Sequence, residues 1–271
     1  MAVGPERDPY YVALLLDALK ECENYRPAFG SEGVDGVSLE SFRQLYASDP
    51  LYHWVGLDSP MMYAAHKAAG GMTSVYRQLG IGCERLVREV VKDNLNLTAD
   101  RVAWSYKYEK ENGAPGVHTL DARIDTEHLK DGRARTRLAA WLAAVAQSLR
   151  LPPRRAKALR GTVFEVRQGY KSADSKRQNA DLRFGMRAYN ENYLPVVALV
   201  STQVSAPVCR RYRSAQLLVL LGSLEDDERV STFAFLRKVV GYDLAAFFGR
   251  NSERLRSEFT KVLAVLLSPT N

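Results

Sequence analysis

The chain has 271 residues, of which 46% are hydrophobic and 25% are charged, which is the composition of an ordinary globular protein with a substantial core. The N-terminus, MAVGPERDPYY, lacks a secretory signal, and the apolar runs are far too short to span a bilayer. Three widely spaced cysteines indicate neither a disulfide framework nor a zinc site. We therefore expect a cytoplasmic protein.

The N-terminal part is predicted to be helical. Residues 9–25 have helical periodicity after Asp8-Pro9, and residues 37–47 form a short helix entered through Ser38. Residues 30–36 are expected to be a loop between them. Residues 1–80 are therefore expected to form a helical cap on the core.

A helix and a β-hairpin are predicted next. Residues 83–95 carry apolar side chains at helical spacing. Residues 102–109 and 117–124 alternate in polarity and flank the turn Asn112-Gly113, which favours two antiparallel strands.

The remaining elements alternate between helix and strand. An Ala- and Leu-rich helix over 133–149 leads into a strand that begins at Gly161, and a helix over 182–193 precedes the apolar strand 194–200. This order predicts an α/β protein with a mixed β-sheet flanked by helices. After it we expect a strand over 216–221 and helices over 227–240, 243–248 and 252–267. We expect a single domain over 1–271, with a core at 81–204 and a helical C-terminal part at 205–271.

The strand that begins at Gly161 has an unusual pattern. Its alternation places Glu165, Arg167 and Lys171 on one face, and Phe164 and Val166 on the other. An unpaired polar group costs about 2–7 kcal/mol to bury, so this charged row is expected to line a cleft or to meet an anion. The residues after Lys171 are almost all polar and could not build a core.

Positive charge is concentrated in the same region. From Arg150 to Arg183 there are ten Lys or Arg against three acids, whereas the rest of the chain has 28 of each sign. A basic excess confined to one segment is typical of a polyanion site, although a solvated basic loop is the plainer alternative.

The run GYKSADSKRQNAD resembles the second half of the catalytic motif of PD-(D/E)XK nucleases, in particular Type II restriction endonucleases. In the groups that cut CCGG or CCNGG, a Ser- and Arg-rich run follows the catalytic Lys, and the last carboxylate lies downstream on a helix. The wording is most similar to a group that cuts GGNCC. The chain departs from the common motif at Gly169, which stands where that motif has Glu or Asp, and no Pro precedes Asp121.

The resemblance implies a restriction-endonuclease-like fold and Mg²⁺-dependent hydrolysis of double-stranded DNA. Asp121 and Asp181, with Glu84 or Glu165 as a further ligand, would hold the metal, and Lys171 would orient the attacking water. Three alternatives stay open. Asp125 could replace Asp121, Glu89 could replace Glu84, and Glu84 could instead only favour the positive end of its helix.

Recognition of DNA is expected from the polar run and from a later Arg cluster. Arg suits the acceptors of guanine and Asn or Gln suits adenine. The candidates are Ser172, Ser175, Lys176, Arg177, Gln178, Asn179, Arg210 and Arg211. A palindromic target implies a homodimer, and the resemblance implies a bacterial cytoplasm with a companion DNA methyltransferase that is not a stable partner.

Two other functions remain possible on the same residues. A repair nuclease of the same fold would cut without sequence selection. A non-catalytic DNA-binding protein would keep only the basic strand and would bind with steep salt dependence.

Overall fold

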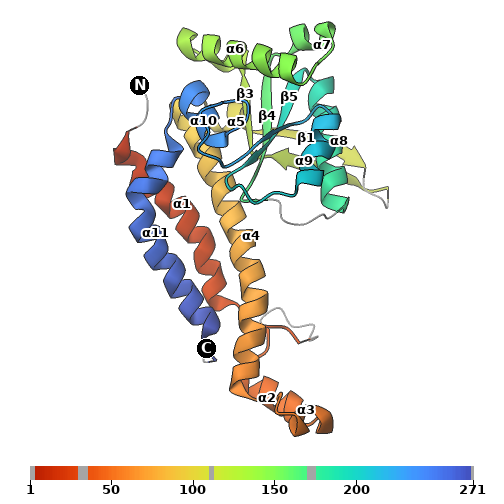
Figure 1. The fold of residues 1–271 in the computed structure, drawn as a ribbon, viewed down its shortest axis with the longest axis vertical. Coiled ribbons are helices and arrows are strands. Elements are labelled where there is room, and N and C mark those ends of the chain that lie inside the picture. Colours follow the sequence, from red (N-terminus) through yellow and green to blue (C-terminus); the bar gives the residue numbers. More distant parts are fainter. Residues whose placement is uncertain (1–3, 30–35, 110–112, 170–174, 270–271) are drawn as a thin grey trace. The chain divides into compact units, whose positions relative to one another are not determined.

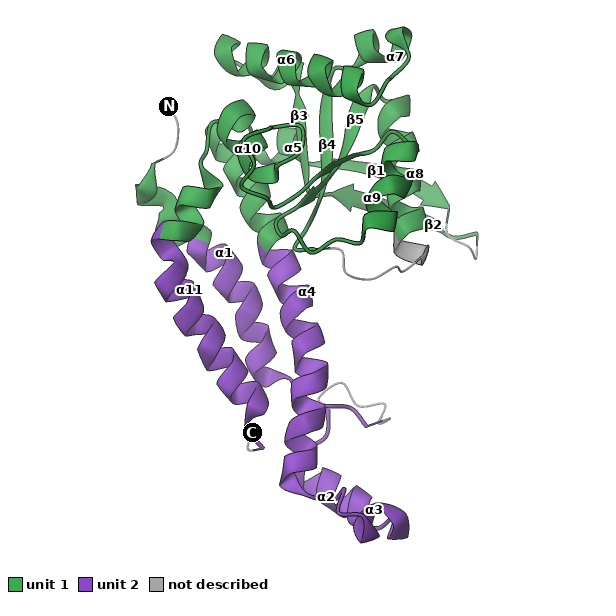
Figure 2. Ribbon diagram, viewed as in Figure 1, with its two compact units in different colours: residues 1–11, 83–249 green, residues 12–82, 250–271 purple. Residues whose placement is uncertain are grey.

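The computed structural model describes residues 4–29, 36–109, 113–169 and 175–269. The chain divides into two compact units, residues 1–11 with 83–249 and residues 12–82 with 250–271 (Figure 2). Three helices supply residues to both units: α1 (Asp8–Lys20), α4 (Pro60–Asn94) and α11 (Leu244–Leu267). Among the described residues, no helix has the length and apolar content needed to cross a membrane.

The first unit is built on a four-stranded mixed sheet in the order β3-β4-β5-β6 (Figure 1). β3 is antiparallel to β4, while β4, β5 and β6 are parallel to one another. The parallel strands are joined by helical crossovers, as parallel neighbours require. This arrangement confirms the predicted mixed α/β sheet. The strands are β3 (Ala122–Asp125), β4 (Gly161–Arg167), β5 (Tyr193–Leu199) and β6 (Leu218–Leu220).

Helices cover both faces of this sheet. On one face Val163 belongs to an apolar cluster with Phe184 and Tyr212, which come from α8 and α9. On the other face Phe164 contacts Phe235, and Trp141 of α6 packs on the same ring. The helices are α6 (Gly132–Ser148), α7 (Pro153–Ala158), α8 (Ser175–Asn190), α9 (Ala206–Ser214) and α10 (Thr232–Phe235).

A separate hairpin precedes the sheet. β1 (Trp104–Glu109) pairs with β2 (Pro115–Leu120) in antiparallel register, which confirms the predicted hairpin. The prediction of one strand over 117–124 is wrong, because β2 ends at Leu120 and β3 begins at Ala122 in the other sheet. The chain leaves one sheet for the other at Asp121, whose backbone N–H donates to the Phe164 carbonyl at 3.0 Å. Residues 99–102, the last of which was expected in a strand, form α5 (Ala99–Val102).

The second unit is helical in its described residues. Besides parts of α1, α4 and α11, it contains α2 and α3. The predicted helix entry at Ser38 is confirmed, since the Ser38 Oγ accepts a hydrogen bond from the Ser41 N–H at 3.2 Å. The short elements of the second unit are η2 (Glu21–Asn24), α2 (Leu39–Ala47) and α3 (Pro50–Trp54). Those of the first unit are η1 (Pro5–Arg7), η3 (Thr126–His128) and a π-helical turn (Leu236–Val240).

The helix expected to begin at residue 83 begins 23 residues earlier, at Pro60, and continues to Asn94 as α4. Gly80 and Gly82 lie inside it and do not mark its start. Gly82 instead permits a close approach, because a Cβ at this position would lie 3.0 Å from the Leu15 Cα. Glu84 is therefore far from the first turn, and the alternative that it only favours the positive end of a helix is wrong.

The C-terminal helices also differ from expectation. The two helices predicted over 243–248 and 252–267 are one continuous helix, α11. The helix predicted over 227–240 is present only as α10 and the π-helical turn after it. Asn251 and Ser252, which lie at the predicted boundary between the two helices, are interior residues of α11.

The two glycines of α4 give opposite expectations for substitution by alanine. Gly80→Ala meets no atom within 4 Å and should stabilise the protein by about 0.5–1 kcal/mol, since Ala is the better helix former. Gly82→Ala should instead cost about 1–3 kcal/mol, because the new methyl group presses on the α1 backbone. Urea unfolding of both variants measures the difference, and equal shifts would contradict the close approach.

Candidate functional site

Asp121 is fixed at the junction between the two sheets. Its Oδ2 accepts a hydrogen bond from the Val166 N–H of β4 at 2.7 Å. Arg88 of α4 donates through Nε to the Asp121 carbonyl at 2.6 Å, and its Nη2 lies 3.4 Å from the Asp121 Oδ1. The side chain is only 11% exposed. The central strand and the long helix together therefore hold this carboxylate beside the second half of β4.

Glu165 and Arg167 point to the same face of β4, as the alternation predicts, and form an ion pair of 3.1 Å. The same Arg167 Nη2 donates to Asp181 Oδ1 of α8 at 2.6 Å. The Tyr212 hydroxyl of α9 donates to Asp181 Oδ2 at 2.5 Å. Asp181 lies on a helix as expected, and Arg167 links it to Glu165.

The carboxylates of this site repel one another in a buried position. Burial, followed by the negative charges of Glu165 and Glu84, raises the pKa of Asp121 to about 7. Burial also raises the pKa of Asp181, although Arg167 and Tyr212 oppose the rise. The negative charge of Glu165 contributes to both shifts, so Glu165 interacts electrostatically with Asp121 and with Asp181.

His118 of β2 adds a further group to the site. Its Nε2 lies 3.5 Å from Glu165 Oε2, and its hydrogen bond with Glu165 raises the pKa of His118. His118 belongs to the β1–β2 hairpin, whose register pairs it with Tyr106. Its imidazole therefore connects the hairpin to the acidic cluster.

The donor chemistry of the cluster suits a hard divalent cation. Carboxylate oxygens are the ligands that Mg²⁺ prefers, and a cation near Asp121 and Glu165 would relieve their mutual repulsion. Within the described residues, however, no three His, Cys, Asp or Glu side chains form a ready group for a metal ion. A metal site could thus form around Asp121 and Glu165. Glu84 is near enough for its charge to raise the pKa of Asp121.

The alternative ligands have other partners. Asp125 pairs with Gly161 in the β3–β4 register, four residues along β4 from Glu165, and it accepts from the Tyr193 hydroxyl at 2.6 Å. It therefore has a structural role at the far end of the strand. Glu89 forms an ion pair with Lys92 and accepts from the Tyr10 hydroxyl at 3.0 Å.

The expected recognition residues are described only in part. Lys171 and Ser172 lie outside the described residues, and the side chains of Ser175, Lys176 and Arg177 in α8 do too. Gln178 and Asn179 accept hydrogen bonds from Arg211 of α9 at 2.8 and 2.7 Å, so these three predicted residues are brought together. Arg210 is exposed on the same helix.

Four residues of the cluster were not predicted to take part in the metal site: Arg88, His118, Arg167 and Tyr212. For Arg167 the sequence did contain an indication, because strand alternation places it on the same face as Glu165. The other three come from α4, β2 and α9, and no local pattern connects these elements to β4.

Comparisons of the chain with protein-family models, with curated proteins and with solved structures found no match.

Arg167 is expected to be the main structural cation of the cluster. Arg167→Met should destabilise the protein by about 3–5 kcal/mol, because Asp181 and Glu165 would lose their buried partner. The exposed Arg133 of α6 is a matched control, and Arg133→Met should change stability by about 0.5 kcal/mol or less. Urea unfolding at pH 7.5 compares them, and a similar small change in both would contradict the assignment.

The raised pKa of Asp121 predicts a pH dependence of stability. The native carboxyl titrates near 7 and the unfolded one near its ordinary value of about 4, so between these values the native state binds more protons. The unfolding free energy should therefore contain a component that falls from pH 5 to pH 8, and Asp121→Asn should remove it. Urea unfolding in EDTA across this range tests this, and parallel curves for both proteins would refute it.

Proposed function

We propose that the protein is a Mg²⁺-dependent endonuclease that hydrolyses double-stranded DNA. Its active site would be formed around Asp121 and Glu165. The observation that carries the proposal is the position of the Asp121 carboxylate, which the Val166 N–H of β4 holds at 2.7 Å next to Glu165. Burial and the charges of Glu165 and Glu84 raise its pKa to about 7. Buried carboxylates that repel one another are a costly arrangement unless a cation joins them. Acidic groups from two adjoining elements are also what the restriction-endonuclease resemblance implies.

Each residue has a separate task in this proposal. Asp121 and Glu165 would hold the cation, with Glu84 as a further ligand, and Arg88 and Val166 would keep the Asp121 carboxylate oriented. The bound cation would stabilise charge on the phosphate and lower the pKa of the attacking water. Arg167 keeps Glu165 and Asp181 in place. Lys171, four residues further along the chain, would orient the water and place positive charge beside the phosphate.

Selection of a DNA sequence would come from α8 and α9. Arg211 joins Gln178 and Asn179 at the start of α8, in the segment where the resemblance places base recognition. Arg177 and Lys176 precede them and would contact guanine. A short GC-rich palindrome, GGNCC or a site containing CCGG, would be read by a homodimer whose symmetry matches that of the site.

A cleavage assay with phage DNA and Mg²⁺ tests the proposal, and discrete fragments are expected. Asp121→Asn, Glu165→Gln and Lys171→Ala should each lower the cleavage rate at least about 100-fold, because each removes a ligand or a charge at the reacting phosphate. Asp100→Asn, which changes an exposed carboxylate on α5, is the control and should cut normally.

Metal binding is tested apart from cleavage. Mg²⁺ should raise the melting temperature of the wild-type protein and of the Asp100 variant, but not that of Asp121→Asn. A smear of fragments would favour a repair nuclease without sequence selection. Salt-sensitive DNA binding without any cleavage, and without a Mg²⁺ shift, would contradict the proposal and favour the non-catalytic DNA-binding function.

A further inference from the structure

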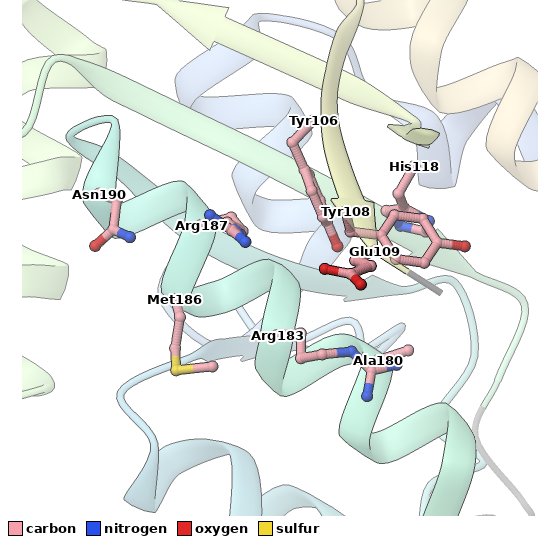
Figure 3. Close-up of a pocket in the computed structure, with 9 residues that line it drawn as sticks. All are labelled: Tyr106, Tyr108, Glu109, His118, Ala180, Arg183, Met186, Arg187 and Asn190. Carbon is pink, nitrogen blue, oxygen red and sulfur yellow. The ribbon is translucent and has the colours of Figure 1, made fainter. Parts of the chain in front are cut away.

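A cavity of about 420 Å³ lies between the β1–β2 hairpin and α8 (Figure 3). His118, one of its lining residues, contacts Glu165 and so joins the cavity to the acidic cluster. This volume is within the range of about 300–1,000 Å³ that is usual for small-molecule sites. Its walls differ in chemistry, since the hairpin supplies aromatic rings and the helix supplies guanidinium groups. None of its lining residues has a role in the metal site proposed above.

The aromatic wall is formed by neighbouring rings on one face of the hairpin. Tyr106 and Tyr108 are two residues apart on β1, and the Tyr106 ring lies 5.3 Å from that of His118. Gly116 is paired with Tyr108, and a Cβ at Gly116 would lie 2.7 Å from two atoms of the Tyr108 ring. The ring of Tyr108 therefore lies across the glycine, which holds it in place. Nucleobases stack on such rings.

The opposite wall carries two arginines. Arg183 and Arg187 are one turn apart on α8 and line the cavity. Both are exposed, and neither guanidinium is engaged in an ion pair within the described part of the chain. Burial, followed by the charge of Glu165, raises the pKa of Tyr106 to about 12, and the positive charges of Arg183 and Arg187 oppose this rise. Both arginines are therefore within electrostatic reach of the aromatic wall. Two exposed guanidinium groups one helical turn apart suit a phosphate.

Among the described lining residues Glu109 is the acidic one, and Figure 3 shows its carboxylate near the Tyr106 ring. A carboxylate repels phosphate but accepts hydrogen bonds from an exocyclic amine, such as N4 of cytosine. The cavity thus combines stacking surfaces, a phosphate-binding pair and an acceptor for an amino-bearing base.

From this combination we propose that the cavity binds one unpaired nucleotide of a DNA strand, with its base on Tyr106 and Tyr108 and its phosphate on Arg183 and Arg187. The base carries an exocyclic amine that donates to Glu109. This inference rests on the proposed function for its substrate class, and it adds that the enzyme prefers DNA with a locally unpaired nucleotide beside the cleavage site.

Binding in EDTA tests the cavity without requiring cleavage. The probes are a fluorescein-labelled duplex with one bulged deoxycytidine, the same duplex with a bulged thymidine, and the fully paired duplex. The deoxycytidine bulge should bind about tenfold more tightly than the paired duplex, as the stacking of one base allows. The thymidine bulge should lose part of this gain because it lacks the amine.

Variants of the lining residues test whether the preference for the bulged duplex arises in this cavity. Tyr108→Ala and Arg187→Ala should each bind bulged and paired duplexes equally, and Tyr108→Trp should restore the preference. Gly116→Ala should also weaken it by displacing the Tyr108 ring. Lys107→Ala is the control, because Lys107 is an exposed cation of β1 that is not among the described residues lining the cavity, and it should leave the preference unchanged. Circular dichroism checks that each variant folds.

Equal binding of the bulged and paired duplexes by the wild-type protein would overturn the proposal, as would a full preference in Tyr108→Ala. Saturable binding of dCMP by a protein that shows no bulge preference would assign the cavity to a free nucleotide and would also overturn it. Loss of bulge preference with normal Mg²⁺-dependent cleavage would leave the proposed nuclease function intact. A bulge preference without cleavage would instead support the cavity alone.

Discussion

Charged side chains of β4 and α8 that meet with little access to water impose the main constraint on the first unit. Glu165, Arg167 and Asp181 lie where water is largely excluded, so each must have a partner of opposite charge or a hydrogen bond. Arg167 satisfies two carboxylates at once, and Tyr212 supplies a further donor to Asp181. The packing of α8 and α9 against the sheet is thus tied to a polar network as well as to an apolar cluster.

Asp121 is less fully compensated than Asp181. It receives a backbone hydrogen bond and a long contact from Arg88, yet burial and two negative neighbours still raise its pKa to about 7. A buried group with so perturbed a pKa is costly for stability, and such costs are often found where a protein binds or reacts. The network around Arg167 and the buried carboxylate of Asp121 both contact the second half of β4, so the compensated and the poorly compensated charges lie close together.

The hairpin extends this site toward solvent. β1 and β2 form their own small sheet, and the chain crosses to the main sheet at Asp121. One crossing point therefore places His118 and the aromatic rings of β1 next to the carboxylates of the main sheet. The cavity beside α8 is lined by residues of both hairpin strands and of the helix.

The sequence by itself determined the local elements and one face of the central strand. Alternation in 161–167 was enough to place Glu165 and Arg167 together, and Ser38 was enough to mark a helix start, because both depend on neighbours in the chain. It did not reveal that α4 continues through two glycines, since the tolerance of Gly82 depends on the distant backbone of Leu15. It also did not reveal the break at Asp121, the link from Arg167 to Asp181 or the approach of His118 to Glu165. Only the tertiary structure decided these, because ion pairs, burial and the resulting pKa shifts depend on residues from separate elements meeting in space.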